Sequence, residues 1–289
     1  MKIEKVIKIL TMGATLFRLM KKYPKISLLL VIPLIFLPIY EIFIGRANMV
    51  YMGVPTTNSF NPKRFTRVFR NSSFMLGYSD YRGNPLWVTY KLTKIPKDAK
   101  KLKRPDKFES DWRTFSRVSS DDYSRSGYDR GHMAPNFAIS RLYGRDAQIS
   151  TFLMSNISPQ KAKLNRGIWR KLEGIEVKYF TKLFDEVWVF TGPIFDKNIE
   201  KLSTSNKVEI PDAFYKIYVG VKKDKTAKAL AFIIPQTVTG KEPLRKFVTT
   251  IDEIEKQTGI DFLYKLEDKL ENKLESSKDI TAWRLKSFE

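Results

Sequence analysis

The chain has 289 residues, of which 43% are hydrophobic and 13% aromatic, and its formal net charge is +21. It has one histidine and no cysteine, which excludes disulfides, thiolate nucleophiles and zinc sites built from cysteines or several histidines. The length allows one large domain or two small ones. The charge favours a polyanionic partner, either nucleic acid or an acidic membrane surface, over a basic surface kept only for solubility.

An apolar segment near the N-terminus, residues 26–44, reads ISLLLVIPLIFLPIYEIFI and contains one charged residue. A helix of this length spans about 28 Å, close to the thickness of a bilayer's hydrocarbon core, and Pro33 and Pro38 are expected to kink it. Three lysines precede the segment closely, whereas only Arg46 follows it closely. The positive-inside rule then predicts a basic cytoplasmic leader at residues 1–25 and export of the remaining chain. The rival interpretations are a cleaved signal peptide, a mitochondrial targeting segment and a buried core helix.

The rest of the chain predicts a tether followed by one domain of mixed strands and helices. Residues 45–69 are polar with Pro, Asn and Gly, which is typical of a tether, and a domain is expected at 70–289. Residues 93–127 are charged and rich in turn formers, so loops are expected there. Strands and helices follow no βαβ rhythm, which favours an α+β fold. The expected strands are 84–92, 186–195, 214–221 and 229–235, and the expected helices are 165–184, 244–259 and 262–276, the last of which could equally be a solvated charged segment.

The only histidine, His132, lies in the stretch YDRGHMAPN. The four letters DRGH are a weak signal alone, and a lone histidine is more often a surface or core residue than a catalyst. The context downstream strengthens the catalytic interpretation. On a regular helix, Asn165, Trp169 and Glu173 would lie within about 80° of one face and present an amide oxygen and a carboxylate together. The alternative is an ordinary amphipathic helix with a polar stripe.

Further motifs accompany DRGH along the chain. They are Ser155-Asn156, Pro159-Gln160, Leu164-Asn165, Trp169 and Leu172-Glu173, with the stretches NPLWVTY, TGPIF and TGIDF. Together with Asp129-Arg130-Gly131-His132, they resemble the motifs of the DNA/RNA non-specific endonuclease family from about residue 70 to near the C-terminus. The resemblance implies a ββα-metal nuclease core within a larger mixed α/β domain, and the apolar segment adds one N-terminal transmembrane helix before it.

The resemblance also implies the roles of individual residues. His132 would be the general base, and Asn165 the direct protein ligand of Mg²⁺, with Mn²⁺ as the alternative ion. Glu173 would orient water beside the metal, and Arg130 would face the scissile phosphate. The expected supporting residues are Asp129, Asn156, Gln160 and Trp169, with Asn156 and Gln160 bracing the site through hydrogen bonds.

The sequence departs from the family at Val177, where several members carry an arginine. Arg170 and Lys178 are the candidates for supplying that charge. A second family arginine lies upstream of the histidine, and Arg104 and Arg113 are the candidates for this substrate-binding position.

The motifs and the charge together predict a membrane-anchored, metal-dependent, sugar-non-specific endonuclease acting on DNA and/or RNA. The alternative is a nucleic-acid-binding or uptake receptor with little or no catalysis. A basic protein that docks on acidic lipid would explain the charge but not the motifs. The Lys-rich leader favours a bacterial inner membrane, with the domain in the periplasm or outside, over the mitochondrial inner membrane. The sequence is also compatible with a homodimer.

Overall fold

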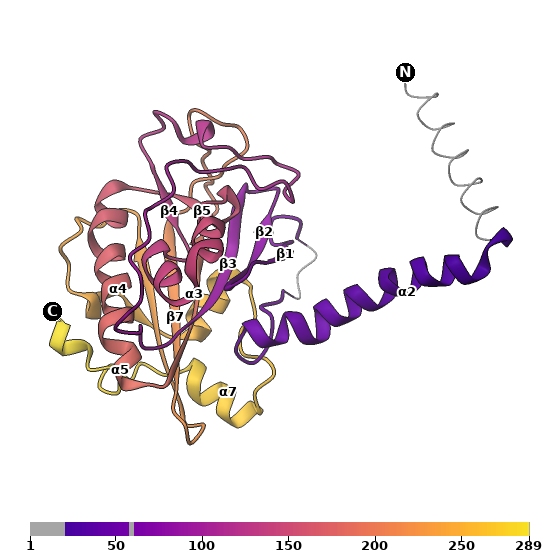
Figure 1. Ribbon diagram of the computed structural model, residues 1–289. Helices are drawn as coiled ribbons and strands as arrows, with labels where there is room; N and C mark the ends of the chain where they lie inside the picture. Colours follow the sequence, from indigo (N-terminus) through magenta and orange to yellow (C-terminus); the bar gives the residue numbers. More distant parts are fainter. Residues whose placement is uncertain (1–20, 58–60, 289) are drawn as a thin grey trace. The chain divides into compact units, whose positions relative to one another are not determined.

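The computed structural model describes residues 21–57 and 61–288 and divides into two compact units, residues 1–48 and 49–289. In the first unit, helix α2 (Pro24–Tyr40) continues through Pro33 and Pro38 and is followed by a π-helical turn at Glu41–Gly45 (Figure 1). Within the described part of the chain, one helix is long and apolar enough to cross a membrane by length and composition. Its apolar window is Ile32–Met49, in which Gly45 alone is buried.

A seven-stranded antiparallel sheet forms the centre of the second unit (Figure 1). The strand order is β1-β2-β3-β6-β7-β8-β9, so β6 pairs with β3 across a long insertion that holds the DRGH motif. The strands are β1 (Arg67–Arg70), β2 (Phe74–Ser79), β3 (Asn84–Leu92), β6 (Glu186–Ile194), β7 (Ala213–Val221), β8 (Ala227–Pro235) and β9 (Val248–Thr249).

Both faces of this sheet are covered, because successive side chains of a strand point to opposite faces. On β3, Val88 and Tyr90 pack in a core cluster with helix α3 (Asn136–Thr151) and with the helical segment that follows residue 163. Trp87 packs instead in a second cluster with helices α6 (Ile251–Thr258) and α7 (Asp268–Glu275). The predicted site residues all lie in or near the insertion and helices on the first of these faces.

The insertion contains the ββα unit that the family resemblance implied. Strand β4 (Asp129–His132) pairs antiparallel with β5 (Ile157–Gln160), and a long helical segment follows. This segment is not the regular α-helix that we expected at 165–184. It consists of a π-helical stretch at Leu164–Trp169, α4 (Arg170–Ile175), a second π-helical stretch at Glu176–Phe180 and α5 (Thr181–Leu183).

The cause of the irregularity is a close backbone contact at Gly167. Its φ and ψ of −100° and −105° are not helical, and a Cβ atom there would lie 2.9 Å from the Cα of Gly240. The helix therefore widens where another backbone crosses it. The angular spacing that we assumed for Asn165, Trp169 and Glu173 on a regular helix was wrong, although all three stay on this segment.

The strands predicted at 84–92, 186–195, 214–221 and 229–235 are confirmed. The helix predicted at 244–259 was wrong in its first half, where Leu244–Phe247 is a 3₁₀ turn and β9 extends the sheet. The β-branched run Val248-Thr249-Thr250 favours an extended chain, and the Thr250 side chain then caps α6 by accepting the backbone N–H of Glu253 at 3.1 Å. Gly259 ends α6 in the left-handed conformation, as expected.

Further differences lie near the two ends of the domain. The prediction for 262–276 is borne out only at α7, because Leu263 has a φ of 50° and the chain before Asp268 forms turns. In the predicted tether, the described residues include buried Val50 and a bridge from Thr56 to Asp261, and β1 begins at Arg67. Strand β2 and helix α3 were not predicted. The loop prediction for 93–127 is confirmed apart from a 3₁₀ turn at Asp121–Tyr123.

Candidate active site

The DRGH motif occupies one strand of the small hairpin. Asp129 lies opposite Gln160, and His132 lies opposite Ile157. Gly131 allows the Gln160 side chain to pack closely against the backbone, because a Cβ atom there would overlap that side chain. The four-residue strand therefore places an acidic and an imidazole side chain three residues apart on a backbone that the hairpin fixes.

Asp129 holds the side-chain amide of Asn165 in one orientation. The Nδ2 atom of Asn165 donates a hydrogen bond to Asp129 Oδ2 at 3.0 Å. A carboxylate only accepts, so the amide nitrogen must face Asp129 and the oxygen must point elsewhere. In the described part of the chain, Asn165 Oδ1 accepts no hydrogen bond. This partly exposed, uncommitted amide oxygen is a hard donor of the kind that Mg²⁺ prefers, so the residues fit the ion that the resemblance implied.

Arg166 holds Asp129 in turn. Its Nη2 and Nε atoms donate to the two carboxylate oxygens at 2.6 and 2.8 Å. Burial raises the pKa of Asp129, but the hydrogen bonds from Arg166 and Asn165 outweigh it and leave the pKa below its ordinary value. Asp129 is therefore ionised at neutral pH and remains an acceptor for Asn165.

His132 lies against two aromatic rings and a cation. Its ring centroid is 5.4 Å from that of Phe108 and 5.1 Å from that of Phe152, and its Nε2 atom is buried without a hydrogen-bond partner in the described residues. Burial lowers the pKa of His132 to about 3, and the charge of Arg104 lowers it further in the same direction. The imidazole is therefore neutral, which is the form able to accept a proton.

Glu173 lies on α4, one turn beyond buried Trp169. Burial raises its pKa to about 7, the charge of Lys216 opposes this rise, and the charge of Glu176 adds to it. The indole nitrogen of Trp169 forms no hydrogen bond, although its N–H lies near enough to Glu173 to favour the carboxylate. Without a bound cation, Glu173 is thus poised between its protonated and ionised forms at neutral pH.

A buried charged cluster lies next to Glu173, and the sequence analysis missed it. Lys216 and Glu176 are both fully buried and form an ion pair of 3.0 Å. Tyr90 and Tyr218 donate their hydroxyl hydrogens to the Glu176 carboxylate at 3.1 and 2.8 Å. The available signal was a lysine in the middle of the apolar strand FYKIYVGV.

Lys216 supplies a positive charge near Glu173, although the position where several family members carry an arginine is Val177 here. Val177 is 8% exposed and packs in the first core cluster, so no cation occupies that position. The cation that favours an ionised Glu173 is Lys216, which also lies 4.8 Å from the ring of Trp169. The predicted substitutes, Arg170 and Lys178, are exposed and line a pocket of about 550 Å³ with Glu173.

Of the two supporting amides, Asn156 makes the hydrogen bonds that we expected and Gln160 does not. Asn156 accepts the backbone N–H of Ala134 at 2.9 Å and donates to the carbonyls of Ala134 and Thr151 at 3.0 Å each. It thereby fixes the turn after His132. Gln160 lies with its side chain against Gly131, and this packing leaves both polar atoms of its amide without a partner in the described residues.

The candidate arginines differ in how many hydrogen bonds their guanidinium groups already make within the protein. Arg130 donates to the carbonyl of Ser120 at 2.5 Å and to Ser124 Oγ at 3.1 Å. Arg104 is exposed, lies 5.0 Å from the ring of Phe152 and influences His132 directly. Arg113 is committed elsewhere, because it donates to both oxygens of Asp111 and to Asn71. Arg104 is therefore the upstream arginine that the structure brings to His132.

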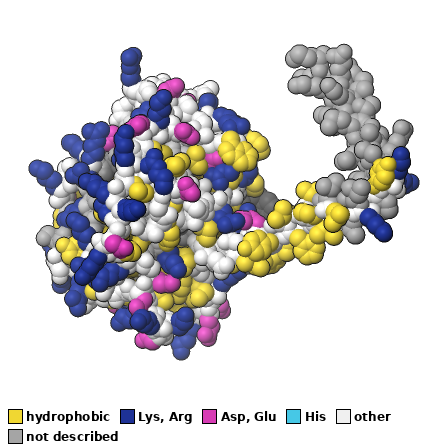
Figure 2. Space-filling view, in the orientation of Figure 1, with side chains coloured by type: hydrophobic (Ala, Val, Ile, Leu, Met, Phe, Trp, Pro, Cys, Tyr) yellow, Lys and Arg dark blue, Asp and Glu magenta, His cyan; other side chains and the backbone are white. Residues whose placement is uncertain are grey.

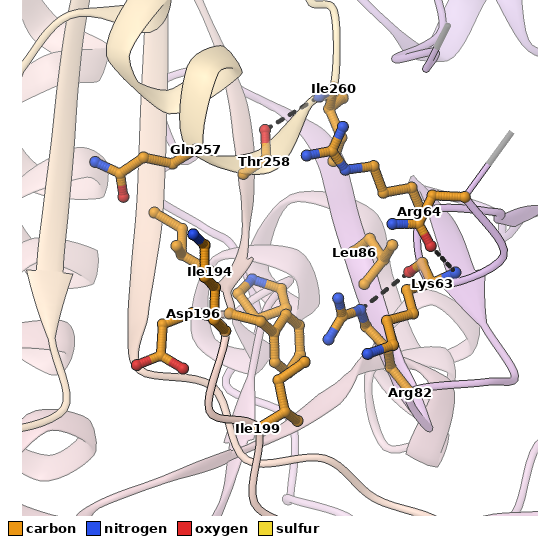
Figure 3. A pocket seen from close by; sticks show the side chains of 14 residues that line it. Lys63, Arg64, Arg82, Leu86, Ile194, Asp196, Ile199, Gln257, Thr258 and Ile260 are labelled. Carbon is orange, nitrogen blue, oxygen red and sulfur yellow. Dashed lines mark hydrogen bonds between the residues drawn. The ribbon is translucent and has the colours of Figure 1, made fainter. Parts of the chain in front are cut away.

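A separate pocket of about 510 Å³ contains none of the predicted site residues (Figure 3). Its lining includes Leu86, Ile194 and Ile260 of the second core cluster, on the opposite face of the sheet. The Arg82 guanidinium beside it donates to the carbonyl of Lys63 at 3.0 Å and pairs with Glu209. The pocket brings together no general base and metal ligand, so it is not the candidate active site.

The comparisons with known proteins agree with this geometry. A family model described as DNA/RNA non-specific endonuclease matches residues 55–269. Nuclease C1 of Cunninghamella echinulata var. echinulata is 38% identical over 50% of this chain and 61% of its own length. The Nuclease of Serratia marcescens is 30% identical over 66% of this chain and 72% of its own length. A solved structure of the EndoG/EndoGI complex matches with a TM-score of 0.61 and 29% identity, over 70% of this chain and 87% of that one.

The chain belongs to the DNA/RNA non-specific endonuclease family. It spans about three-fifths of the length of several curated relatives, including Nuclease C1 and the zebrafish mitochondrial nuclease EXOG.

Proposed function

We propose that this chain is a metal-dependent nuclease that hydrolyses phosphodiester bonds of DNA and/or RNA without sequence preference. The observation that carries the proposal is on β4. One short strand presents a neutral imidazole at His132 and, through Asp129, fixes an uncommitted amide oxygen at Asn165. A proton acceptor on β4 and a hard-cation ligand whose amide β4 orients are groups that hydrolysis of a phosphodiester can use.

Asn165 Oδ1 would hold the ion directly, and Glu173 would contribute from about two turns further along the same helical segment. The ion would be Mg²⁺, with Mn²⁺ as the alternative, and when bound it would stabilise the negative charge that develops on the phosphate and the leaving oxygen. Glu173 would be fully ionised once a cation lies beside it, because an opposite charge lowers the pKa of a carboxyl group.

His132 would accept a proton from the attacking water as the water oxygen bonds to phosphorus and the bond to the 3′ oxygen breaks. A base with a pKa of about 3 accepts a proton weakly in the free protein. A bound phosphate would offset the charge of Arg104, which is one of the two causes of that low pKa. Arg104 and Arg130 would thus bind the phosphate, and Arg104 would link its arrival to a stronger base.

Two exposed aromatic side chains support contact with nucleic acid. Trp112 and Phe115 are 76% and 80% exposed. Residues 100–117 around them hold seven Lys or Arg against three Asp or Glu, and basic side chains are spread over the visible face of the domain (Figure 2). Exposed aromatic rings among cations form stacking surfaces for unpaired bases.

This aromatic loop is fixed to the site. Asp111 accepts a hydrogen bond of 2.6 Å from Ser155, the neighbour of Asn156, and caps the turn at Thr114 through its carbonyl. Trp112 is four residues from Phe108, whose ring packs against His132. Four residues of extended chain span about 14 Å, so the Cα atoms of Trp112 and Phe108 lie within that distance. A base a few nucleotides from the scissile phosphate would reach Trp112 and Phe115.

The apolar N-terminal segment would anchor the domain to a membrane, with the leader in the cytoplasm and the domain on the other side. The support is the length and exposure of the helix and the lysines before it. The Lys-rich leader favours a bacterial inner membrane. The mitochondrial inner membrane is the alternative, and several relatives, including human endonuclease G, are named as mitochondrial. Protease treatment of intact spheroplasts tests the orientation, because a protected domain would overturn it.

The competing proposal is a nucleic-acid receptor with little or no catalysis. Digestion of plasmid and of RNA by the detergent-solubilised full chain, in Mg²⁺ and in EDTA, separates the two. We expect cleavage only with the metal, a loss of at least ~10²-fold in His132→Ala, and loss of metal-dependent cleavage in Asn165→Ala. Asn198→Ala, in a loop outside the site, is the control. Intact substrate with wild-type protein and Mg²⁺, but retained binding, would establish the receptor instead.

A further inference from the structure

Five carboxylates gather on the opposite side of the sheet from His132, around helices α6 and α7. Asp252, Glu255 and Glu275 each place a carboxylate oxygen within 4.8 Å of the others. Asp261 and Glu271 are close enough to raise the pKa of both Glu255 and Glu275. This cluster is separate from the candidate active site, because its helices belong to the second core cluster.

None of these five acids has a salt bridge within the part of the chain that the structure describes. This contrasts with the acids that pair elsewhere, such as Asp80 with Arg67 and Glu209 with Arg82. The chain has 52 Lys and Arg residues, so a cluster of acids without one close cation is unusual for this surface. The helix N-terminus favours an acid at Asp252, but it does not account for Glu255 and Glu275.

Glu275 is the member that points to a ligand. Its side chain belongs to a residue that is 7% exposed, and its Oε1 atom is buried without a hydrogen-bond partner in the described residues. Glu255 is partly satisfied, since its Oε1 accepts the backbone N–H of Phe262 at 2.7 Å. A buried carboxylate oxygen without a partner is costly unless a proton or a cation satisfies it.

We propose that Asp252, Glu255 and Glu275 bind a divalent cation of the calcium type. Two ligands on opposite sides of Ca²⁺ lie about 4.6–5.2 Å apart, because each Ca–O distance is about 2.3–2.6 Å. The three ligand oxygens all lie within 4.8 Å of one another, which is close enough for one Ca²⁺ to contact all three. Mg²⁺ requires about 2.0–2.1 Å and near-octahedral geometry, which carboxylates from two helices meet less easily than the flexible shell of Ca²⁺. Water and the nearby Glu271 would complete the larger coordination shell of calcium.

Glu275 is buried, and Asp252 and Glu255 place their carboxylates beside it, so the folded state must neutralise part of this negative charge. The rival explanation is that protons, rather than a cation, neutralise these acids. The two explanations differ in what calcium does to the stability of the protein. A cation would join α6 to α7 and stabilise the folded state by mass action.

The test is thermal unfolding of the detergent-solubilised full chain at pH 7.5, first in EDTA and then with increasing CaCl₂. We expect calcium to raise the Tm of the wild-type protein by about 5 °C or more, as saturating binding to the folded state does for a domain of this size. MgCl₂ should raise it less. The calcium shift should persist in Asn165→Ala, which removes the proposed catalytic ligand, and this separates the two sites.

The ligand variants decide between calcium and protons. In Glu275→Gln and in the more exposed Asp252→Asn, the calcium shift should fall below about 1 °C, while Glu253→Gln on the same helix should keep it. Asp252→Asn provides the answer if Glu275→Gln does not fold. No calcium shift in the wild-type protein, together with a higher Tm of Glu275→Gln in EDTA, would overturn the proposal and establish shared protons. A shift that survives both ligand variants would also overturn it.

Discussion

Asn165 donates its side-chain N–H to Asp129 at 3.0 Å, and Asp129 lies three residues before His132 on the same strand. The strand that carries the proposed base therefore also sets which end of the Asn165 amide faces a metal. Asp129→Asn would remove this constraint, because an amide can donate as well as accept and would tolerate a flipped Asn165.

We expect Asp129→Asn to weaken metal-dependent activity by about 10- to 100-fold, as changes to groups that orient metal ligands do. The measurement is the Mg²⁺ concentration that gives half-maximal cleavage. Arg166→Ala is the matched control. Arg166 contacts the same carboxylate, but its side chain is 70% exposed, so solvent screens the pair and its loss should change the Mg²⁺ dependence little. An unchanged Mg²⁺ dependence in Asp129→Asn would show that Asp129 does not orient Asn165.

The single histidine makes the proposed base directly observable. With a pKa of about 3, the His132 imidazole should stay neutral down to about pH 4 in the free protein, and one histidine signal in an NMR titration reports it. A non-hydrolysable phosphodiester should raise the pKa by offsetting Arg104. A free-protein titration near pH 6.5 would contradict the desolvation of the ring beside Phe108 and Phe152.

The same shift has a consequence for stability. An unfolded histidine binds its proton near pH 6.5, whereas the folded one binds it near pH 3, so the unfolded state takes up more protons between these values. The contribution of His132 to the free energy of unfolding should therefore fall as the pH drops from about 6.5 toward 3. A smaller pH dependence of Tm in His132→Asn over this range checks the sign.

The sequence predicted the parts of this structure that depend on local patterns. The strands at 84–92, 186–195 and 214–221 are runs of β-branched and aromatic residues, which pack well on the faces of a sheet. The motif predicted that Asp129 and Asn165 lie in one region, and a hydrogen bond joins them, while His132 is on the same strand as Asp129.

What the sequence did not predict depends on contacts between distant residues. The widened helix at Gly167 results from its contact with Gly240, and no local pattern in LNRGIW indicates that crossing. Lys216 and Glu176 are forty residues apart, and only the folded sheet shows that each satisfies the other. Val248–Thr249 became a strand because β8 offered a free edge, which a helical pattern of apolar residues does not reveal.

The exposed aromatic loop should distinguish single-stranded from double-stranded substrates. Stacking of a base on an aromatic side chain contributes about 1–3 kcal/mol, so Trp112→Ala and Phe115→Ala should each weaken binding of an oligothymidine by about 5- to 150-fold. Binding of a blunt duplex, whose bases are already stacked, should change by less than about twofold. The measurement is fluorescence anisotropy in EDTA, which reports binding even if no cleavage occurs.

Tyr264→Ala is the control for this experiment, because Tyr264 is an exposed aromatic residue on the segment between α6 and α7. Equal losses for duplex and single strand would contradict base stacking. A change in Trp112 fluorescence when the full chain enters anionic vesicles without nucleic acid would indicate instead that the loop contacts lipid.

The fully buried pair of Lys216 and Glu176 gives the last prediction, which concerns stability and the site together. Glu176→Leu leaves the Lys216 ammonium buried without its partner, and breaking a buried pair in this way costs about 3–5 kcal/mol. Adding Lys216→Met to Glu176→Leu should recover most of that loss, because the double variant leaves no buried charge. Urea unfolding of the two single variants and the double variant measures the coupling.

The double variant should nevertheless remain impaired in cleavage near neutral pH, since Lys216 is the cation that opposes the rise in the pKa of Glu173. Recovery of both stability and activity would show that the pair serves the fold alone, whereas recovery of stability with an activity profile displaced to higher pH would place Lys216 among the residues that position the site.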